Sequence, residues 1–172
     1  MRNSRFGVTL EGIEAYLFEE ESIVFRDIAL DLRAIIETPA LGEDPVRERL
    51  FPRAYLDPTE ENAEMAWAAF AHPELLESRV NTLVMLIETL NRLEPAPPDR
   101  DAGEMKMVLL SPEETEVWLK GLNDLRLALG TRLNITEEQN VVESPDPHAQ
   151  LRQIYDWLTA IQQDLLEQVY LS

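Results

Sequence analysis

Four prolines that each follow a helix-capping residue divide this chain into helical segments. The pairs are Asp44-Pro45, Asp57-Pro58, Ser111-Pro112 and Asp146-Pro147. A short polar side chain caps the free N–H groups at the start of a helix, and proline fits the first turn because the N–H it lacks would be unpaired there. We therefore predict helices that begin near these four prolines, and a mainly α-helical fold.

Apolar residues recur with the helical period of about 3.6 residues in the N-terminal half. One helix is predicted from Ile13 to Ile36 and another from Pro58 to Ala71. His72-Pro73 either breaks or kinks the chain before a further helix, Leu75 to Leu93.

Two more helices are predicted in the C-terminal half, over residues 112–133 and 147–170. The first has a complete start signal, because Ser111 and Glu114 have the spacing of a capping box.

Two short segments, Phe6–Leu10 and Met105–Leu110, have the composition of β-strands. Each leads into a predicted helix, so the two junctions are either a weak internal repeat or a chance similarity. A two-stranded ribbon is unstable unless helices support it. We predict a compact, bundle-like helical domain over residues 1–172, with at most this minimal sheet. The proline-rich stretch 94–104 is predicted to be a flexible loop or linker.

The net charge of −18 limits the class of partner. The charge is spread evenly, so no basic region is available for a phosphate backbone, and direct binding of DNA or RNA is disfavoured. A basic patch on another protein suits this surface better. The simpler alternative is that the charge keeps the protein soluble.

No catalytic or metal-binding motif is visible. The chain has no cysteine, which excludes thiol catalysis and thiol redox sensing within it. Glutamate does not stand three residues before His72 or His148, which are predicted to be surface residues, and no nucleophile elbow or phosphate loop occurs. We predict a non-enzyme without metal or cofactor. The lack of a signal peptide or membrane span favours the cytoplasm.

Polar residues interrupt an otherwise apolar helix at Leu122–Leu133. Asn123, Arg126 and Gly130 share one face of this helix, and Asp124 falls on another side. A buried polar group costs stability unless it finds a partner, so this pairing serves either the fold or a binding site.

Arg126 is the residue on which these alternatives differ. In the structural alternative it pairs with a carboxylate, for which Asp156, Glu14 and Glu116 are candidates, beside a close helix crossing at Gly130. In the functional alternative, Arg126 and Arg132 bind an anion or a partner peptide. Trp157 lies off the apolar stripe of the last helix, so it either packs in the core or anchors a partner. The candidate binding residues are Asn123, Asp124, Arg126, Arg132, Tyr155 and Trp157.

Three segments carry a family resemblance: Leu119–Leu133, Tyr155-Asp156-Trp157-Leu158 and Arg49–Tyr55. With them the chain resembles an actinobacterial family of oxidation-sensing regulators, which is also classed as a domain of unknown function. The resemblance implies a role in stress or transcriptional regulation, through a transcription factor rather than bare DNA. The characterised type of that family senses oxidation with a cysteine pair, which this chain lacks.

Three hypotheses of function remain at this point. The first is a non-catalytic, cytoplasmic regulatory or adaptor protein that acts through protein–protein contacts. The second is a small-molecule-binding or enzymatic domain whose pocket lies between helices 112–133 and 147–170 and uses Asn123, Arg126 and Tyr155. The third is a homodimer with Trp157 or Trp67 at its interface.

Overall fold

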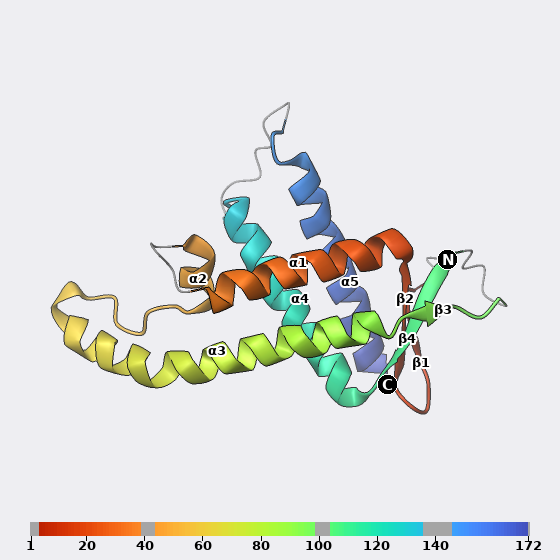
Figure 1. The fold of residues 1–172 in the computed structure, drawn as a ribbon, viewed down its shortest axis with the longest axis horizontal. Coiled ribbons are helices and arrows are strands. Elements are labelled where there is room, and N and C mark those ends of the chain that lie inside the picture. Colours follow the sequence, from red (N-terminus) through yellow and green to blue (C-terminus); the bar gives the residue numbers. More distant parts are fainter. Residues whose placement is uncertain (1–3, 39–43, 99–103, 136–145, 172) are drawn as a thin grey trace.

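The computed structural model describes residues 4–38, 44–98, 104–135 and 146–171 (Figure 1). Its helices are α1 (Glu19–Glu37), α2 (Pro45–Leu50), α3 (Glu61–Asn91), α4 (Pro112–Arg132) and α5 (Ala149–Leu171), with a short 3-10 helix at Pro58–Glu60. The prediction of a mainly helical fold is confirmed. None of the described helices is long and apolar enough to cross a membrane.

The sheet is larger than predicted. It contains β1 (Phe6–Val8), β2 (Ile13–Phe18), β3 (Glu94–Pro95) and β4 (Met105–Leu110), in the antiparallel order β1-β2-β4-β3. The two predicted strands are present but do not pair with each other, because β2 lies between them. The prediction of a two-stranded ribbon was therefore wrong.

Gly12 explains why Ile13–Phe18 forms a strand instead of the first turns of a helix. The Thr9 N–H donates to the Gly12 carbonyl at 2.9 Å and closes a tight turn after β1. Gly12 has a φ of +152°, and a Cβ there would lie 2.1 Å from the carbonyl oxygen of Leu110. Only glycine permits this conformation and this close approach, so the chain can turn back and pair with β4.

Two strand–helix units form the centre of the fold. β2 runs directly into α1 and β4 runs almost directly into α4, and the two strands pair from Ile13↔Leu110 to Phe18↔Met105. In the first turn of each helix a glutamate accepts from the backbone N–H three residues earlier: Glu21 from Phe18 at 2.9 Å, and Glu114 from Ser111 at 3.0 Å. The strand that leads into α1 is therefore β2 and not the predicted strand Phe6–Leu10.

The structure also joins two segments that were predicted separately. α3 continues through Pro73 as one helix, so the helices predicted before and after His72-Pro73 are a single element. Glu94–Pro95, within the predicted linker, forms β3 and pairs with β4. Residues 99–103 of that linker lie outside the described residues.

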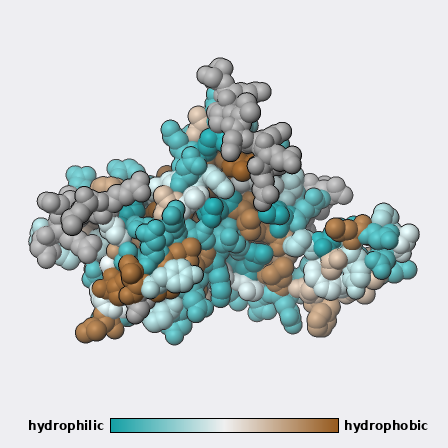
Figure 2. Space-filling view, turned by 180° about the vertical axis from the view of Figure 1, so that it is seen from behind, coloured by the Kyte–Doolittle hydropathy of each residue, from teal (hydrophilic) through white to brown (hydrophobic). Residues whose placement is uncertain are grey.

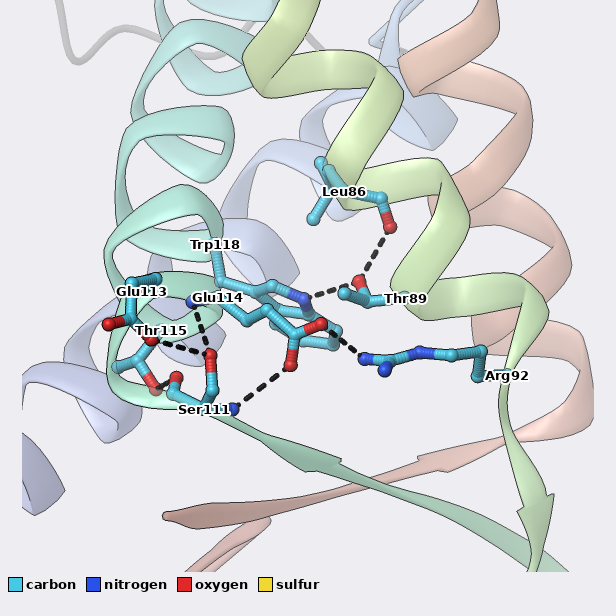
Figure 3. A network of polar contacts seen from close by, with 8 residues as sticks. All are labelled: Leu86, Thr89, Arg92, Ser111, Glu113, Glu114, Thr115 and Trp118. Carbon is cyan, nitrogen blue, oxygen red and sulfur yellow. Dashed lines mark hydrogen bonds and ion pairs between the residues drawn. The ribbon is translucent and has the colours of Figure 1, made fainter.

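Trp118 of α4 occupies the middle of the core and is fully buried. Its ring meets Phe6 of β1 and Phe25 of α1 edge to face, with centroids 6.3 and 5.3 Å apart. Its indole N–H donates to Thr89 Oγ1 of α3 at 2.7 Å, and that hydroxyl donates to the Leu86 carbonyl at 2.7 Å (Figure 3). One side chain therefore joins the sheet to three helices.

We expect Thr89→Val to lower the free energy of unfolding by about 1–3 kcal/mol, because it leaves the buried indole N–H of Trp118 without an acceptor. Urea denaturation followed by circular dichroism measures the change. Thr82→Val is the matched control on the same helix, because the Thr82 hydroxyl donates only to its own helix, at the Ser78 carbonyl. Equal losses in the two variants would contradict this role of Thr89.

Candidate functional site

The polar residues of α4 point to three different neighbouring helices. Asp124 pairs with Arg79 of α3, Arg126 contacts α5, and Arg132 pairs with Asp44 at the start of α2 at 3.0 Å. Asn123 is exposed. The four α4 candidates therefore have different neighbours, and these contacts do not bring them together.

Asp124 is the buried carboxylate of α4, with 5% of its surface exposed. Burial raises the pKa of Asp124, and the hydrogen bond and positive charge of Arg79 oppose that rise. The Arg79 guanidinium also lies over the ring of Phe51, 5.8 Å from its centroid. Sequence reasoning expected a buried arginine–carboxylate pair on this helix, and the structure forms one with different residues.

Arg126 has no carboxylate partner among Asp156, Glu14 and Glu116, so that prediction was wrong. Its Nε donates to Thr159 Oγ1 at 2.9 Å and its Nη1 donates to Gln162 Oε1. The guanidinium lies 5.6 Å from the centroid of the Tyr155 ring. Neutral oxygens and an aromatic face satisfy this arginine.

The alternative pocket between α4 and α5 was predicted to use Asn123, Arg126 and Tyr155. Arg126 and Tyr155 contact each other across the helix pair, and Asn123 is exposed. A Cβ at Gly130 would lie 3.4 Å from the Tyr155 ring, an ordinary van der Waals distance, so this packing does not require glycine.

Trp157 borders hollow surface on two sides. It is half-buried, its ring packs edge-on against Phe25 with centroids 5.8 Å apart, and its Nε1–H donates to Glu21 Oε1 at 3.1 Å. Glu21 Oε2 also accepts from Arg5 Nη1 at 2.5 Å. Glu21 therefore fixes Trp157 and the N-terminal segment at the start of α1.

One hollow of about 280 Å³ lies between α1 and α5, and we call it the Trp157 groove. It is lined by Glu20, Glu21, Val24, Gln150, Gln153, Ile154 and Trp157. A second hollow, of about 500 Å³, lies on the other side of Trp157 and includes Arg5 and Asp164. Sequence reasoning found Trp157 and missed its neighbours on α1, because nothing in the sequence alone places α1 beside α5.

The described residues contain no group of three His, Asp or Glu side chains placed to hold a metal ion. His72 was predicted to be a surface residue, but it is half-buried and packs against Phe51 and Trp67, with ring centroids 5.8 and 5.4 Å apart. His148 is exposed, as predicted.

These features define an acidic, mainly helical domain with a four-stranded sheet and an apolar groove that has carboxylates at its edge. The chain belongs to the family described as "Domain of unknown function (DUF2017)", whose model matches residues 1–169. The family resemblance recognised in the sequence is thereby confirmed.

Two relatives illustrate the similarity. The chain is 29% identical over 136 residues to the "Putative oxidative stress regulator AosR" of Mycobacterium leprae, which covers 72% of this chain and 58% of the relative. It is 28% identical over 135 residues to the "Oxidative stress regulator AosR" of Mycobacterium tuberculosis, covering 72% and 57% respectively. The chain thus spans less than two thirds of the length of these relatives. No solved structure matches it.

The Arg79–Asp124 pair gives a test of the structural role of α4. We expect Asp124→Ala to lower the free energy of unfolding by about 3–5 kcal/mol, because it leaves a mostly buried guanidinium unpaired. The double variant Arg79→Met, Asp124→Leu should recover most of that loss, since neither charge remains. Urea denaturation of both variants decides this, and a double variant less stable than Asp124→Ala would contradict it.

Asp44 links the start of α2 to α4 and gives a pH-dependent prediction. Burial alone would raise the pKa of Asp44, but the Val46 N–H and the Arg132 guanidinium outweigh it, so the pKa is lowered. When folding lowers the pKa of a carboxyl group, the ionised group stabilises the fold at pH values above the pKa of the unfolded state. This stabilisation is lost as the pH falls through the pKa of the folded state.

We therefore expect Asp44→Ala to lower the free energy of unfolding by about 0.5–2 kcal/mol at neutral pH, as for other lost helix caps. The loss should shrink in acid as Asp44 of the unmodified protein becomes protonated. Urea titrations of both proteins between pH 7 and pH 3 test this. A loss that stays constant over that range would show that the ionised carboxylate contributes nothing.

Proposed function

We propose that this protein regulates a response to oxidative stress by binding another protein at the Trp157 groove. The observation that carries the regulatory role is its similarity to proteins named oxidative stress regulators, over 72% of its length. The groove supports the mode of action, because it combines apolar surface with nearby charge.

The groove favours a partner segment that is both apolar and basic. Val24, Ile154 and Trp157 offer apolar surface, while Glu20 and Glu21 place carboxylates at one side. Tryptophan is among the side chains that contribute most to protein interfaces. The net charge of −18 attracts basic surfaces and speeds their association. A basic segment of a transcription factor has this chemistry.

The same charge argues against direct contact with DNA or RNA, since no basic half of the chain exists to neutralise phosphates. The chain has no cysteine, so a thiol of its own does not detect the oxidant. In the proposed function an oxidant-sensitive thiol belongs to the partner, and this protein acts as a non-catalytic adaptor that holds it.

Matched charge reversals on one helix test the groove. Glu20→Lys changes a groove residue, and Asp31→Lys makes the same change at an exposed position of α1 farther along the helix. Affinity purification of the tagged protein from the cells that make it, followed by mass spectrometry, would identify partners. Calorimetric titration with the purified partner would then measure the affinity of each variant.

We expect Glu20→Lys and Ile154→Glu each to lower the affinity for the partner at least about tenfold, which corresponds to about 1.4 kcal/mol of binding free energy. Asp31→Lys should bind like the unmodified protein. In cells, Glu20→Lys should change the transcript response to hydrogen peroxide as deletion of the gene does. Equal affinity of all variants for the partner would exclude the groove as the binding site. An unchanged transcript response to peroxide after deletion of the gene would exclude the regulatory role.

A further inference from the structure

The first part of α3 extends away from the rest of the molecule. Figure 1 shows this segment, with the chain before it, lying beyond α2 and the end of α1. In α3, all of which is described, Glu64 is buried and the other buried residues begin at Leu83. We call residues 51–77, from Phe51 through this part of α3, the arm.

The arm is held together by its own contacts. The buried Glu64 carboxylate accepts from the backbone N–H groups of Ala54 and Tyr55 at 3.0 and 2.8 Å. Arg53 pairs with Glu61 at 2.5 Å. On the inner side His72 packs between the rings of Phe51 and Trp67. The arm is therefore a formed unit and not a fraying helix end.

The outer face of the arm is apolar. At 100° per residue, six exposed apolar residues fall within one half of the helix circumference, and the exposed polar residues Asn62 and Glu77 flank them on the same side. The six are Ala63, Met65, Ala66, Ala69, Phe70 and Pro73. Phe70 is 77% exposed and Met65 63%. In Figure 2 the arm is the lobe on the right, where brown and tan surface appears.

The middle of this face carries no charge. The protein carries 33 acidic residues, yet no charged residue lies on the outer face between Met65 and Pro73. Helical stability in proteins comes mainly from packing an apolar face, and such a face rarely stays in water without a partner. Exposed apolar surface of this kind is typical of an interaction site.

We propose that a second copy of this chain covers the face, with two arms packed antiparallel about a two-fold axis. A two-fold interface must be self-complementary, and this face carries both a large and several small side chains. In the antiparallel arrangement, Phe70 of each copy lies over Ala66 and Ala69 of the other. The alanines allow the two backbones to approach closely.

Charge favours this occupant. The middle of the face, from Met65 to Pro73, carries no charge and offers a basic partner nothing to attract it, whereas two copies meet there without bringing like charges into contact. Because the arm projects, the two bodies, each with a net charge of −18, stay apart.

Sedimentation equilibrium of the purified full chain tests the proposal. We expect a dimer for the unmodified protein and a dissociation constant at least about a hundredfold higher for Phe70→Glu, because one charge would be buried at the centre. Leu10→Glu is the matched control at a fully exposed leucine in the turn between β1 and β2, and it should remain dimeric. Circular dichroism confirms that each variant is folded.

A monomeric unmodified protein at about 100 μM, well above the dissociation constants of most specific homodimers, would overturn the proposal and leave the face to a different protein. A folded Phe70→Glu variant that is still dimeric would overturn it as well. The Trp157 groove lies outside the arm, so Glu20→Lys should leave the dimer intact. Failure of the dimer is thus distinguishable from failure of the proposed function.

The absence of cysteine allows a second, geometric test. In the antiparallel arrangement the two Ala69 positions lie beside the axis, whereas the two Ala63 positions are roughly 20 Å apart, from a rise of about 1.5 Å per residue. A disulfide requires Cα atoms within about 7 Å. Mild oxidation should therefore link Ala69→Cys into a dimer and leave Ala63→Cys unlinked. Linkage of Ala63→Cys without Ala69→Cys would overturn the arrangement.

Discussion

The indole of Trp118 is the contact on which the rest of the structure depends. Its ring meets Phe6 and Phe25 edge to face, and its N–H is held by Thr89 (Figure 3). These contacts bring β1, α1 and α3 around α4. One helical turn further along α4, a Cβ at Gly121 would lie 2.9 Å from a Leu86 methyl group, so α3 and α4 approach closely there. The hydroxyl of Thr89 accepts from the one polar atom of the indole, so Trp118 is fully buried without an unpaired donor.

The polar residues of α4 are explained by the same central position. Asp124, Arg126 and Arg132 each bond to a different helix, so they set how α3, α5 and α2 are oriented around α4. Buried polar groups add little net stability when paired but penalise every arrangement that leaves them unpaired. The most conspicuous stretch of the sequence therefore has a structural role, and the two surfaces that we propose for partners lie elsewhere.

Two such surfaces lie toward opposite ends of the molecule. The Trp157 groove is near the start of α1, close to the sheet, and the arm extends beyond the far end of α1 (Figure 1). Their chemistry differs as well, since carboxylates stand beside the groove whereas the outer face of the arm carries no charge between Met65 and Pro73. A pair of chains joined through their arms would leave both grooves free, and two linked grooves bind a two-site partner more tightly than one.

The sequence by itself determined the features that depend on local chemistry. Asp44-Pro45 and Ser111-Pro112 start helices as predicted, Met105–Leu110 is a strand, and the family was recognisable from its motifs. These features could be predicted because caps, prolines and apolar periods act within a few residues.

Only the tertiary structure decided the features that depend on distant residues. Ile13–Phe18 is a strand because β4, almost a hundred residues later, supplies its hydrogen bonds, and Gly12 lets the chain reach it. Arg126 pairs with Thr159 and Gln162 because α5 packs there, although three carboxylates were equally reasonable candidates from spacing. The Trp157 groove likewise exists because α1 crosses α5, where Trp157 contacts Phe25 and Glu21 (Figure 1). Partner choice is a long-range property, since many pairings satisfy the same local pattern and only packing of the whole chain selects among them.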